Sequence, residues 1–235
     1  MYPQGNRDQR DQRDQRKQGG QEVYFRIGLG TDIHALVPKR KLILGGIEIP
    51  HSKGLKGHSD ADAVAHATID AILGAMGESD IGELFPDHEE QYKDASSMLL
   101  LEDVIQTMKD KQFRVSNLDI VIHAEEPKLT EYKMPIRENL AKAFDVNIQQ
   151  VSVKAKTQEG FGAVGKKEAI SVQAIILLRK YVQRKRWNNN HKNDNHGNKN
   201  FRQDFRGRNK QFQGNYNEGR SQMMGNTKWP STRER

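Results

Sequence analysis

The middle of the chain contains five segments in which apolar residues either stand at alternate positions or form short continuous runs. Such segments, bounded by glycine, proline or polar clusters, are typical of β-strands. In the third of them Leu118, Ile120 and Ile122 alternate with other residues, and the last is too continuously apolar to face water. Strands are therefore predicted at residues 23–30, 41–49, 115–125, 151–157 and 169–181.

Three further segments space their apolar residues three to four positions apart, as amphipathic helices do. They cover about residues 60–76, 96–113 and 134–146. In the first, Ser59 followed by Asp62 fits a capping box, and Gly77 is the expected stop. Taken with the "VSVKAKT" and "AISVQAIILLRKY" strands near the end, this order predicts an α/β (α+β) fold. A mixed β-sheet should be covered on one face by helices.

Composition divides the chain into a central part and two extensions. Residues 1–22 contain three copies of Arg-Asp-Gln, and residues 181–235 are rich in Asn, Gln, Gly, Lys and Arg. Neither segment has enough apolar residues to bury a core, so both are predicted to be disordered. Residues 23–180 are then a single domain of ordinary size.

The net charge of +7 is unevenly distributed. Counting Lys and Arg against Asp and Glu gives 5 − 4 = +1 for residues 1–22, 20 − 23 = −3 for 23–180 and 13 − 4 = +9 for 181–235. A mildly acidic domain argues against nucleic-acid binding by the whole domain. The basic tail also carries aromatic residues, namely Trp187, Phe201, Phe205, Phe212, Tyr216 and Trp229. Two interpretations stay open for it: a weak contact with RNA, or a solvated extension without a partner.

The chain has no cysteine, which excludes disulfides, thiolate nucleophiles and cysteine-based zinc sites. Any metal must therefore be held by His, Asp or Glu. The N-terminal segment lacks the apolar stretch of a signal peptide, and no apolar run is long enough to span a bilayer. We expect a cytoplasmic protein that does not enter membranes.

Asp32, His34 and His66 are the candidate metal ligands. Asp32 and His34 stand two apart in an extended segment and so share a face, while Asp62, His66 and Asp70 form one stripe of an otherwise apolar helix. Three nitrogen and oxygen ligands with an open fourth position are typical of catalytic zinc. The alternatives are a turn aspartate with a chance neighbour, and a core histidine satisfied by a carboxylate.

Two loops have a composition that suits substrate binding. "SDIGELFPDHEE" follows the first helix, and "VKAKTQEGFGAVGKKEA" places lysines, Thr157 and Glu159 around three glycines, a composition suited to phosphate and a second cation. Without other support, the first could be a solvated acidic loop and the second a hairpin loop.

Three longer stretches resemble a known family. They are "RIGLGTDIHAL", "LILGGIEIPHSKGLKGHSDADAVAHATIDAILGAMGESDIGELFPDHEEQYKDASS" and "VSVKAKTQEGFGAVGKKEAI". Together they are similar to the 2-C-methyl-D-erythritol 2,4-cyclodiphosphate synthases of the non-mevalonate isoprenoid pathway, over nearly all of residues 24–180. The resemblance implies a homotrimer with active sites between neighbouring subunits.

The resemblance also implies roles for individual residues. Asp32, His34 and His66 would bind zinc, Glu159 would help to hold magnesium or manganese on the diphosphate, and His58 and Thr157 would act on the phosphates. The implied substrate-binding residues are Ser59, Asp80, Ile81, Gly82, Phe85, Pro86, Asp87, His88, Glu89, Ala124, Pro127, Lys128, Leu129, Lys156 and Lys166.

The reaction implied is a cyclisation in which the substrate's own 2-phosphate attacks its diphosphate and CMP leaves, so no side-chain nucleophile is required. The sequence departs from the family's usual residues at several positions around the substrate. They are Leu29 for histidine, His88-Glu89 for Thr-Asp, Lys156 and Gln158 within a run of threonines, Ala163 for an aromatic residue, and Lys166-Lys167 for Arg-Gly.

Overall fold

The structure, a computed structural model, describes residues 21–86, 89, 92 and 95–183. Its strands are β1 (Gln21–Pro38), β2 (Leu42–Leu44), β3 (Ile47–Ile49), β4 (Lys53–Leu55), β5 (Arg114–His123), β6 (Val151–Lys156) and β7 (Ala169–Gln183). Its helices are α2 (Ala63–Met76), α3 (Ile81–Leu84), α4 (Ser97–Asp110), α5 (Lys133–Phe144), the 3-10 helix η2 (Ile148–Gln150) and α6 (Gly162–Gly165). Among these described helices, none has the length and hydropathy that crossing a bilayer requires.

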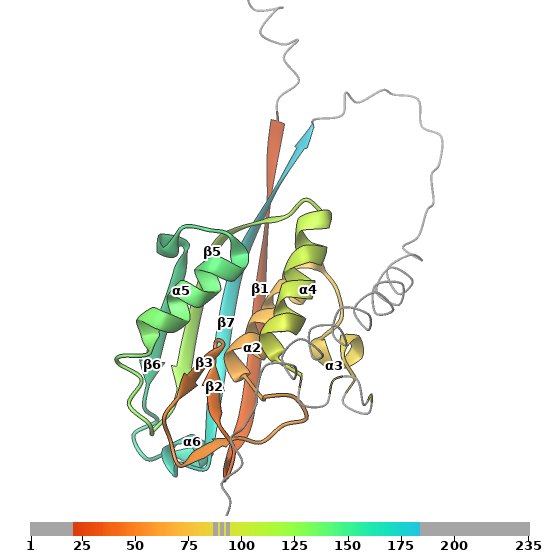
Figure 1. The fold of residues 1–235 in the computed structure, drawn as a ribbon. Helices are drawn as coiled ribbons and strands as arrows, with labels where there is room; N and C mark the ends of the chain where they lie inside the picture. Colours follow the sequence, from red (N-terminus) through yellow and green to blue (C-terminus); the bar gives the residue numbers. More distant parts are fainter. Residues whose placement is uncertain (1–20, 87–88, 90–91, 93–94, 184–235) are drawn as a thin grey trace, which may run out of the picture. The chain divides into compact units, whose positions relative to one another are not determined.

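Five strands form a mixed sheet in the order β4-β1-β7-β5-β6, and β2 and β3 form a separate hairpin. β1 and β7 pair antiparallel from Gln21 opposite Gln183 to Ala35 opposite Ala169, and the last residues of β1 pair with β4. β5 is antiparallel to β7 and parallel to β6. The paired ends of β1 and β7 project beyond the other strands (Figure 1). They run slightly past the predicted domain limits, residues 23 and 180, and most of the two predicted extensions lies outside the described residues.

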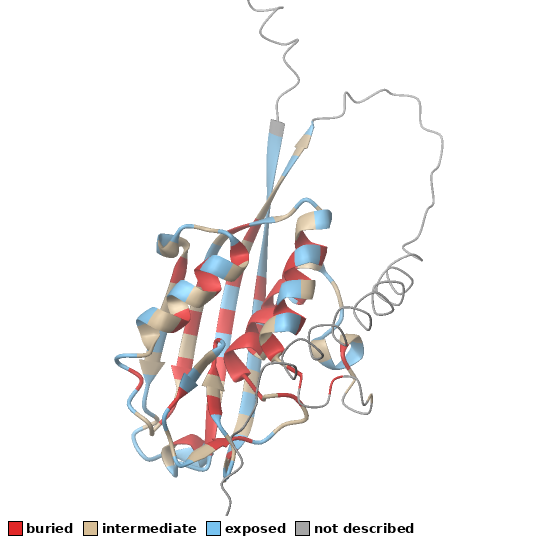
Figure 2. Ribbon diagram, viewed as in Figure 1, coloured by how far each residue is buried: buried red, intermediate tan, exposed pale blue. Residues whose placement is uncertain are grey.

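Helices α2, α4 and α5 all lie on one face of this sheet (Figure 1). The strands show the matching period of two, because Ile170, Val172, Ala174, Ile176 and Leu178 of β7 are all buried. Figure 2 shows the result as bands of buried residues along the strands beneath the helices. The predicted class, an α/β fold with a mixed sheet and helices, is confirmed.

The opposite face of the sheet is uncovered by other described elements and carries apolar side chains. Ile27 is 71% exposed, Leu29 62% and Ile33 58%, and Leu29 lies opposite Ile175, which is also exposed. The prediction that the last strand is too apolar to face water is therefore wrong for one face of β7 in this single chain.

The start of α2 differs from the predicted capping box. Asp62 is the N-cap residue, and its carboxylate accepts hydrogen bonds from the N–H groups of Val64 and Ala65. It also accepts from Gly45 and Gly46, which make the turn of the β2–β3 hairpin with positive φ angles. Burial raises the pKa of Asp62 to about 6, against the effect of these N–H groups. The helix consequently begins at Ala63, three residues after the predicted start.

Candidate functional site

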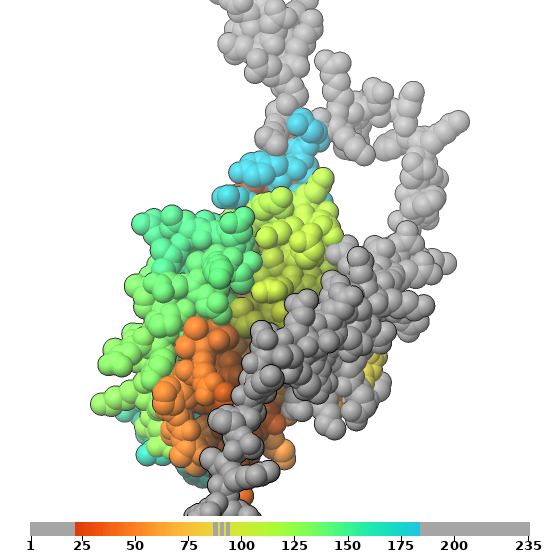
Figure 3. Space-filling model, viewed as in Figure 1, coloured from red at the N-terminus to blue at the C-terminus, as the bar shows by residue number. Residues whose placement is uncertain are grey.

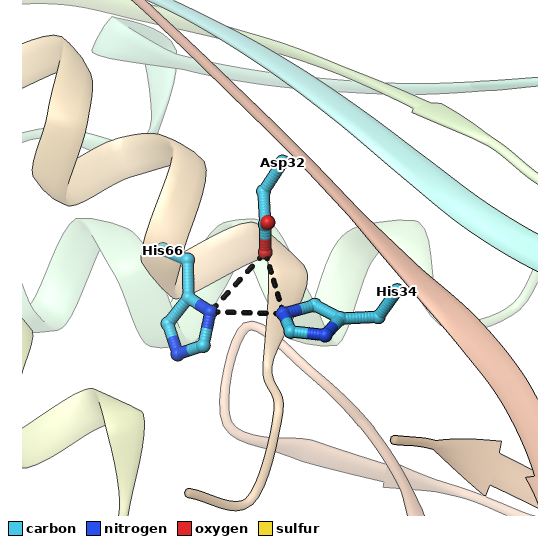
Figure 4. A group of neighbouring side chains, drawn as sticks. All are labelled: Asp32, His34 and His66. Carbon is cyan, nitrogen blue, oxygen red and sulfur yellow. Dashed lines mark hydrogen bonds and ion pairs between the residues drawn. The ribbon is translucent and has the colours of Figure 1, made fainter. Parts of the chain in front are cut away.

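Asp32 and His34 of β1 and His66 of α2 point toward one another (Figure 4). The Asp32 Oδ2 atom lies 2.9 Å from His34 Nε2 and 3.1 Å from His66 Nδ1, and the two histidine nitrogens are 3.2 Å apart. One ligand atom from each residue lies within 4.8 Å of the others, and all three residues are half-buried. The donors are two imidazole nitrogens and a carboxylate oxygen, a set that suits zinc and similar divalent cations. The group could therefore hold a metal ion, as predicted.

Two glycines allow helix and strand to approach closely enough for this convergence. Gly28 and Gly30 are on the same face of β1 as Asp32 and His34, directly beneath α2. A Cβ atom at Gly28 would lie 1.8 Å from the carbonyl oxygen of Ala71, and one at Gly30 would lie 2.0 Å from that of Ala67. Any larger residue would push the helix away, and His66 with it.

Hydrogen bonds on the outer side of each imidazole set which nitrogen faces the centre. His34 Nδ1 is 2.7 Å from the carbonyl oxygen of Lys56, to which it donates, so the Nε2 lone pair is directed toward Asp32 and His66. Burial opposes ionisation of Asp32. When no cation is bound, protonated imidazoles of His34 and His66 can donate to Asp32, and these hydrogen bonds and their charge outweigh burial and hold the pKa of its carboxyl well below the usual range. Asp32 is thus a carboxylate, ready to bind a cation.

A cavity of about 220 Å³ opens beside these three residues. Its lining includes the predicted residues His58, Ser59, Ile81, Gly82 and Phe85. Within the described part of the chain, His58 Nε2 is buried without a hydrogen-bond partner. Unpartnered buried polar atoms are costly, so a polar partner for this nitrogen would be stabilising.

The other predicted residues of the loop after α2 are Asp80, Pro86, Asp87, His88 and Glu89. Asp80 is the N-cap of α3 and accepts a hydrogen bond from Glu83 N at 3.0 Å. The sequence had predicted a loop here and not this short helix. Pro86 and Glu89 are half-buried. Asp87 and His88 lie outside the described residues.

A second group of predicted residues gathers at a different place, where the parallel strands β5 and β6 end. Ala124 N donates to the carbonyl oxygen of Lys156 at 2.9 Å, which joins the Ala124–Leu129 segment to the Lys156–Glu159 segment. The Thr157 hydroxyl donates to Glu159 Oε1 at 2.6 Å, and both residues are exposed. Pro127 is half-buried and Leu129 buried, whereas Lys128 and Lys166 are exposed.

The structure does not bring the two groups together within this chain. In the sheet, β7 and β5 lie between the strand of Asp32 and the strand that ends at Lys156. Among the described residues, those that line the 220 Å³ cavity include neither Thr157, Glu159, Lys156 nor Lys128.

The Asp62, His66 and Asp70 stripe is partly confirmed, since it faces inward. Its members serve different purposes, however: Asp62 caps the helix, and Asp70 accepts from Ile81 N at 2.8 Å and so holds α3 against α2. Burial raises the pKa of Asp70. Only His66 joins the proposed ligands.

Several residues at the site were not predicted. Gly28 and Gly30 could have been found, because glycine at alternate positions on the face that carries Asp32 and His34 indicates a close approach of backbone. Ser97 and Asp60, which lie behind His66, left no such signal, since their contacts join segments far apart in sequence.

A profile of the YgbB family matches residues 25–179. The 2-C-methyl-D-erythritol 2,4-cyclodiphosphate synthase of Brachyspira hyodysenteriae is 52% identical over 155 residues, which are 66% of this chain and 98% of the relative. The enzyme of the same name from Caldicellulosiruptor bescii is 47% identical over 154 residues, 66% of this chain and 98% of the relative. Among solved structures, an IspF–CDP complex from Plasmodium falciparum superposes with a TM-score of 0.58 at 36% identity, covering 66% of this chain and 95% of that one.

Proposed function

This chain belongs to the YgbB family, and from that membership we infer that it is a 2-C-methyl-D-erythritol 2,4-cyclodiphosphate synthase, a lyase of the non-mevalonate isoprenoid pathway. One structural observation supports the location of the active site. Asp32, His34 and His66 converge beside one cavity, which is also lined by His58 and Ser59. A divalent cation held by these ligands, with hydrogen-bonding side chains beside it, would stabilise the charge of phosphate groups.

The enzyme converts 4-diphosphocytidyl-2-C-methyl-D-erythritol 2-phosphate into the cyclic diphosphate and CMP. An oxygen of the 2-phosphate forms a bond to the β-phosphorus, and the bond from that phosphorus to the bridging oxygen breaks. The electron pair of the broken bond leaves with CMP. Because the nucleophile is already part of the substrate, the protein has to position charged phosphates in line and to stabilise their charge.

The cavity beside β1 and α2 supplies groups for this task. His58, whose Nε2 has no hydrogen-bond partner, and Ser59 would bind the phosphates, while Ile81, Gly82 and Phe85 offer an apolar wall for the methylerythritol carbons. Asp80, Pro86, Asp87, His88 and Glu89 complete this substrate loop in our proposal.

The group at the ends of β5 and β6 is proposed to bind the nucleotide. Segment Ala124–Leu129 and Lys156 would hold the cytidine, with Thr157 and Lys166 directed to the phosphates. The CDP complex of the Plasmodium falciparum relative supports a nucleotide substrate for the family.

The two cation sites differ in their donors. Asp32, His34 and His66 would hold zinc or a similar divalent ion, and Glu159 would hold magnesium or manganese, a hard cation that prefers oxygen. When bound, such ions neutralise phosphate charge and polarise the P–O bonds. The exposed Glu159 carboxylate has room for both a cation and the diphosphate.

We propose a homotrimer in which the cavity of one subunit is completed by the nucleotide group of its neighbour. Two observations support this arrangement. The two groups are separated within one chain, and the uncovered sheet face exposes Phe25, Ile27, Leu29 and Ile33 in a row on β1. An apolar row of this kind is costly in water and suits burial between subunits.

The experiment is an assay of CMP release from the authentic substrate with purified full-length protein and added divalent metal. Wild type should release CMP, and Asp32→Asn, which keeps the shape of the side chain but loses its charge, should be nearly inactive and should bind little zinc. Glu48→Gln, which removes an exposed carboxylate paired with Lys41 on the β2–β3 hairpin, is the control and should resemble wild type. Full activity of Asp32→Asn without zinc would contradict the proposed site.

A further inference from the structure

Ser97 lies behind His66, on the side of the imidazole opposite to Asp32 and His34. It is the first residue of α4 and is fully buried. Its Oγ atom is 2.8 Å from His66 Nε2, whereas His66 Nδ1 faces Asp32 and His34. α2 and α4 lie side by side on the covered face of the sheet (Figure 1).

Ser97 is in turn held by Asp60. Its Oγ is 2.5 Å from Asp60 Oδ1, and its backbone N–H lies 3.2 Å from each oxygen of the same carboxylate. Asp60 therefore makes two separable contacts with Ser97. One caps the first turn of α4 through the backbone, and the other binds the side-chain hydroxyl.

The direction of the protons along this chain follows from what each group can do. A carboxylate only accepts, so the Ser97 hydroxyl donates its single proton to Asp60. The Ser97 oxygen then offers a lone pair to His66, and the proton of the imidazole must be on Nε2. Nδ1 is left with a lone pair directed at the centre of the metal site. Ser59 Oγ, 3.3 Å from His66 Nε2 and 3.2 Å from Ser97 Oγ, borders the same contact.

We propose that Asp60 and Ser97 are positioning residues that fix the tautomer and orientation of His66, so that it binds the divalent cation through Nδ1. Lys56 has the corresponding effect on His34 through its carbonyl oxygen, with the opposite nitrogen left for the metal. Partners of this kind raise the basicity of the ligand and restrict its rotation, and losing one typically lowers metal affinity by about 10- to 100-fold.

This inference rests on the proposed metal site, and the test measures metal binding without substrate, so that it is independent of cyclisation. Full-length protein is stripped of metal, and the affinity for zinc is measured by competition with a chromophoric chelator. The visible spectrum of the cobalt form reports the ligand geometry, and thermal melting of the metal-free protein reports stability.

Ser97→Ala removes the hydroxyl but keeps the backbone N–H that Asp60 caps. We expect its zinc affinity to fall by about 10- to 100-fold and its cobalt spectrum to change. Thr68→Val is the matched control, because Thr68 is a fully buried hydroxyl residue of α2, the helix that carries His66, and donates only to the carbonyl of Val64. Its affinity should equal that of wild type.

A double-mutant cycle separates this role from simple capping. Asp60→Asn should weaken zinc binding when Ser97 is present, and should have no further effect on affinity in the Ser97→Ala background. The asparagine oxygen can still accept from the N–H groups of Ser97 and Asp62, so the change acts on the metal through the Ser97 hydroxyl. Independent, additive losses would overturn the proposal, as would a Ser97→Ala affinity equal to that of Thr68→Val.

If Ser97→Ala melts below the assay temperature, Ser97→Thr, which keeps the hydroxyl, is measured in its place. Wild-type zinc affinity in Ser97→Thr supports the positioning role of Ser97, and a folded Ser97→Thr with reduced zinc affinity contradicts it. If wild type binds no zinc, the proposed metal site itself fails.

Discussion

Thr157 and Glu159 are exposed, yet the 2.6 Å hydrogen bond between them fixes the direction of the carboxylate. Glu159 has a positive φ angle of 50°, which turns the chain sharply into the glycine-rich segment after it. The pair is therefore held at the end of β6 by local contacts.

Replacing Glu159 by Gln should lower the rate of CMP release by at least about 100-fold, because the second cation loses its carboxylate ligand while the side chain keeps its size. The measurement is the rate across a titration with magnesium or manganese, together with zinc content, which should stay at the wild-type level. Glu138→Gln, an exposed position on α5, serves as the control. A Glu159→Gln rate that equals wild type at every magnesium concentration would remove Glu159 from the site.

The packing of α2 on β1 is the element-scale feature on which the metal group depends. The two elements meet at Gly28 and Gly30, and they contribute all three candidate ligands. A change in their separation therefore acts on stability and on the site at once.

Gly30→Ala should destabilise the protein by about 3 kcal/mol and lower zinc affinity, because the new Cβ meets backbone atoms that cannot move aside. Thermal melting and zinc competition measure the two effects. Gly74→Ala is the matched control, at an exposed position of α2 where the nearest atom of β1 to the new Cβ, the carbonyl oxygen of Leu29, is 3.9 Å away. Alanine favours helix, so this variant should be as stable as wild type or slightly more stable. A stable Gly30→Ala with normal zinc binding would show that the close approach is not needed.

At the scale of the whole molecule, the uncovered sheet face is the surface that a trimer would bury and a monomer would leave in water. Figure 3 shows the opposite, helix-bearing side, where α4 and α5 pack around the β2–β3 hairpin. On that side α2, α4 and α5 cover the sheet, whereas no described element covers the apolar row from Phe25 to Ile33.

Ile27→Glu should therefore break the trimer and reduce CMP release, since it places a charge in the centre of the apolar row. Light scattering gives the mass, which should fall from that of three chains to that of one. Met134→Glu, on exposed α5, should remain a trimer. Wild-type protein that is monomeric and fully active would refute the shared site.

The basic C-terminal tail is the other feature of the whole molecule that can be tested. Residues 184–235 have a net charge of 13 − 4 = +9 and lie outside the described residues. If the tail contacts RNA, the binding should be weak, nonspecific in sequence and steeply reduced by salt, because it neutralises backbone phosphates.

Truncation after Gln183 should leave CMP release nearly unchanged and abolish RNA retention at low salt, as measured by filter binding. RNA binding that survives truncation would place the contact on the domain. If full-length protein retains no RNA, the tail is a solvated extension, the other interpretation of its composition.

The sequence by itself determined the residues that are able to act and most of the elements that carry them. Periodicity predicted α2, α4, β5, α5, β6, β7 and the first part of β1, because alternation and helical spacing are local properties of a chain. β1 continues past the predicted end at Gly30 to Pro38, and the predicted strand 41–49 is divided into β2 and β3. The absence of cysteine limited any metal to nitrogen and oxygen ligands, and the paired spacing of Asp32 and His34 placed them on one face. The start of α2 was misplaced, since Asp62 is satisfied partly by Gly45 and Gly46 of a distant hairpin.

Only the tertiary structure decided which of these residues meet. His66 reaches Asp32 because the α2 backbone rests on Gly28 and Gly30, and Ser97 reaches His66 because α4 packs beside α2. The strand order places β7 and β5 between the metal group and the strand leading to Thr157, and leaves the β1 side chains of one sheet face uncovered. Such contacts join residues tens of positions apart, and they depend on the packing of whole elements, which no local pattern of residues encodes.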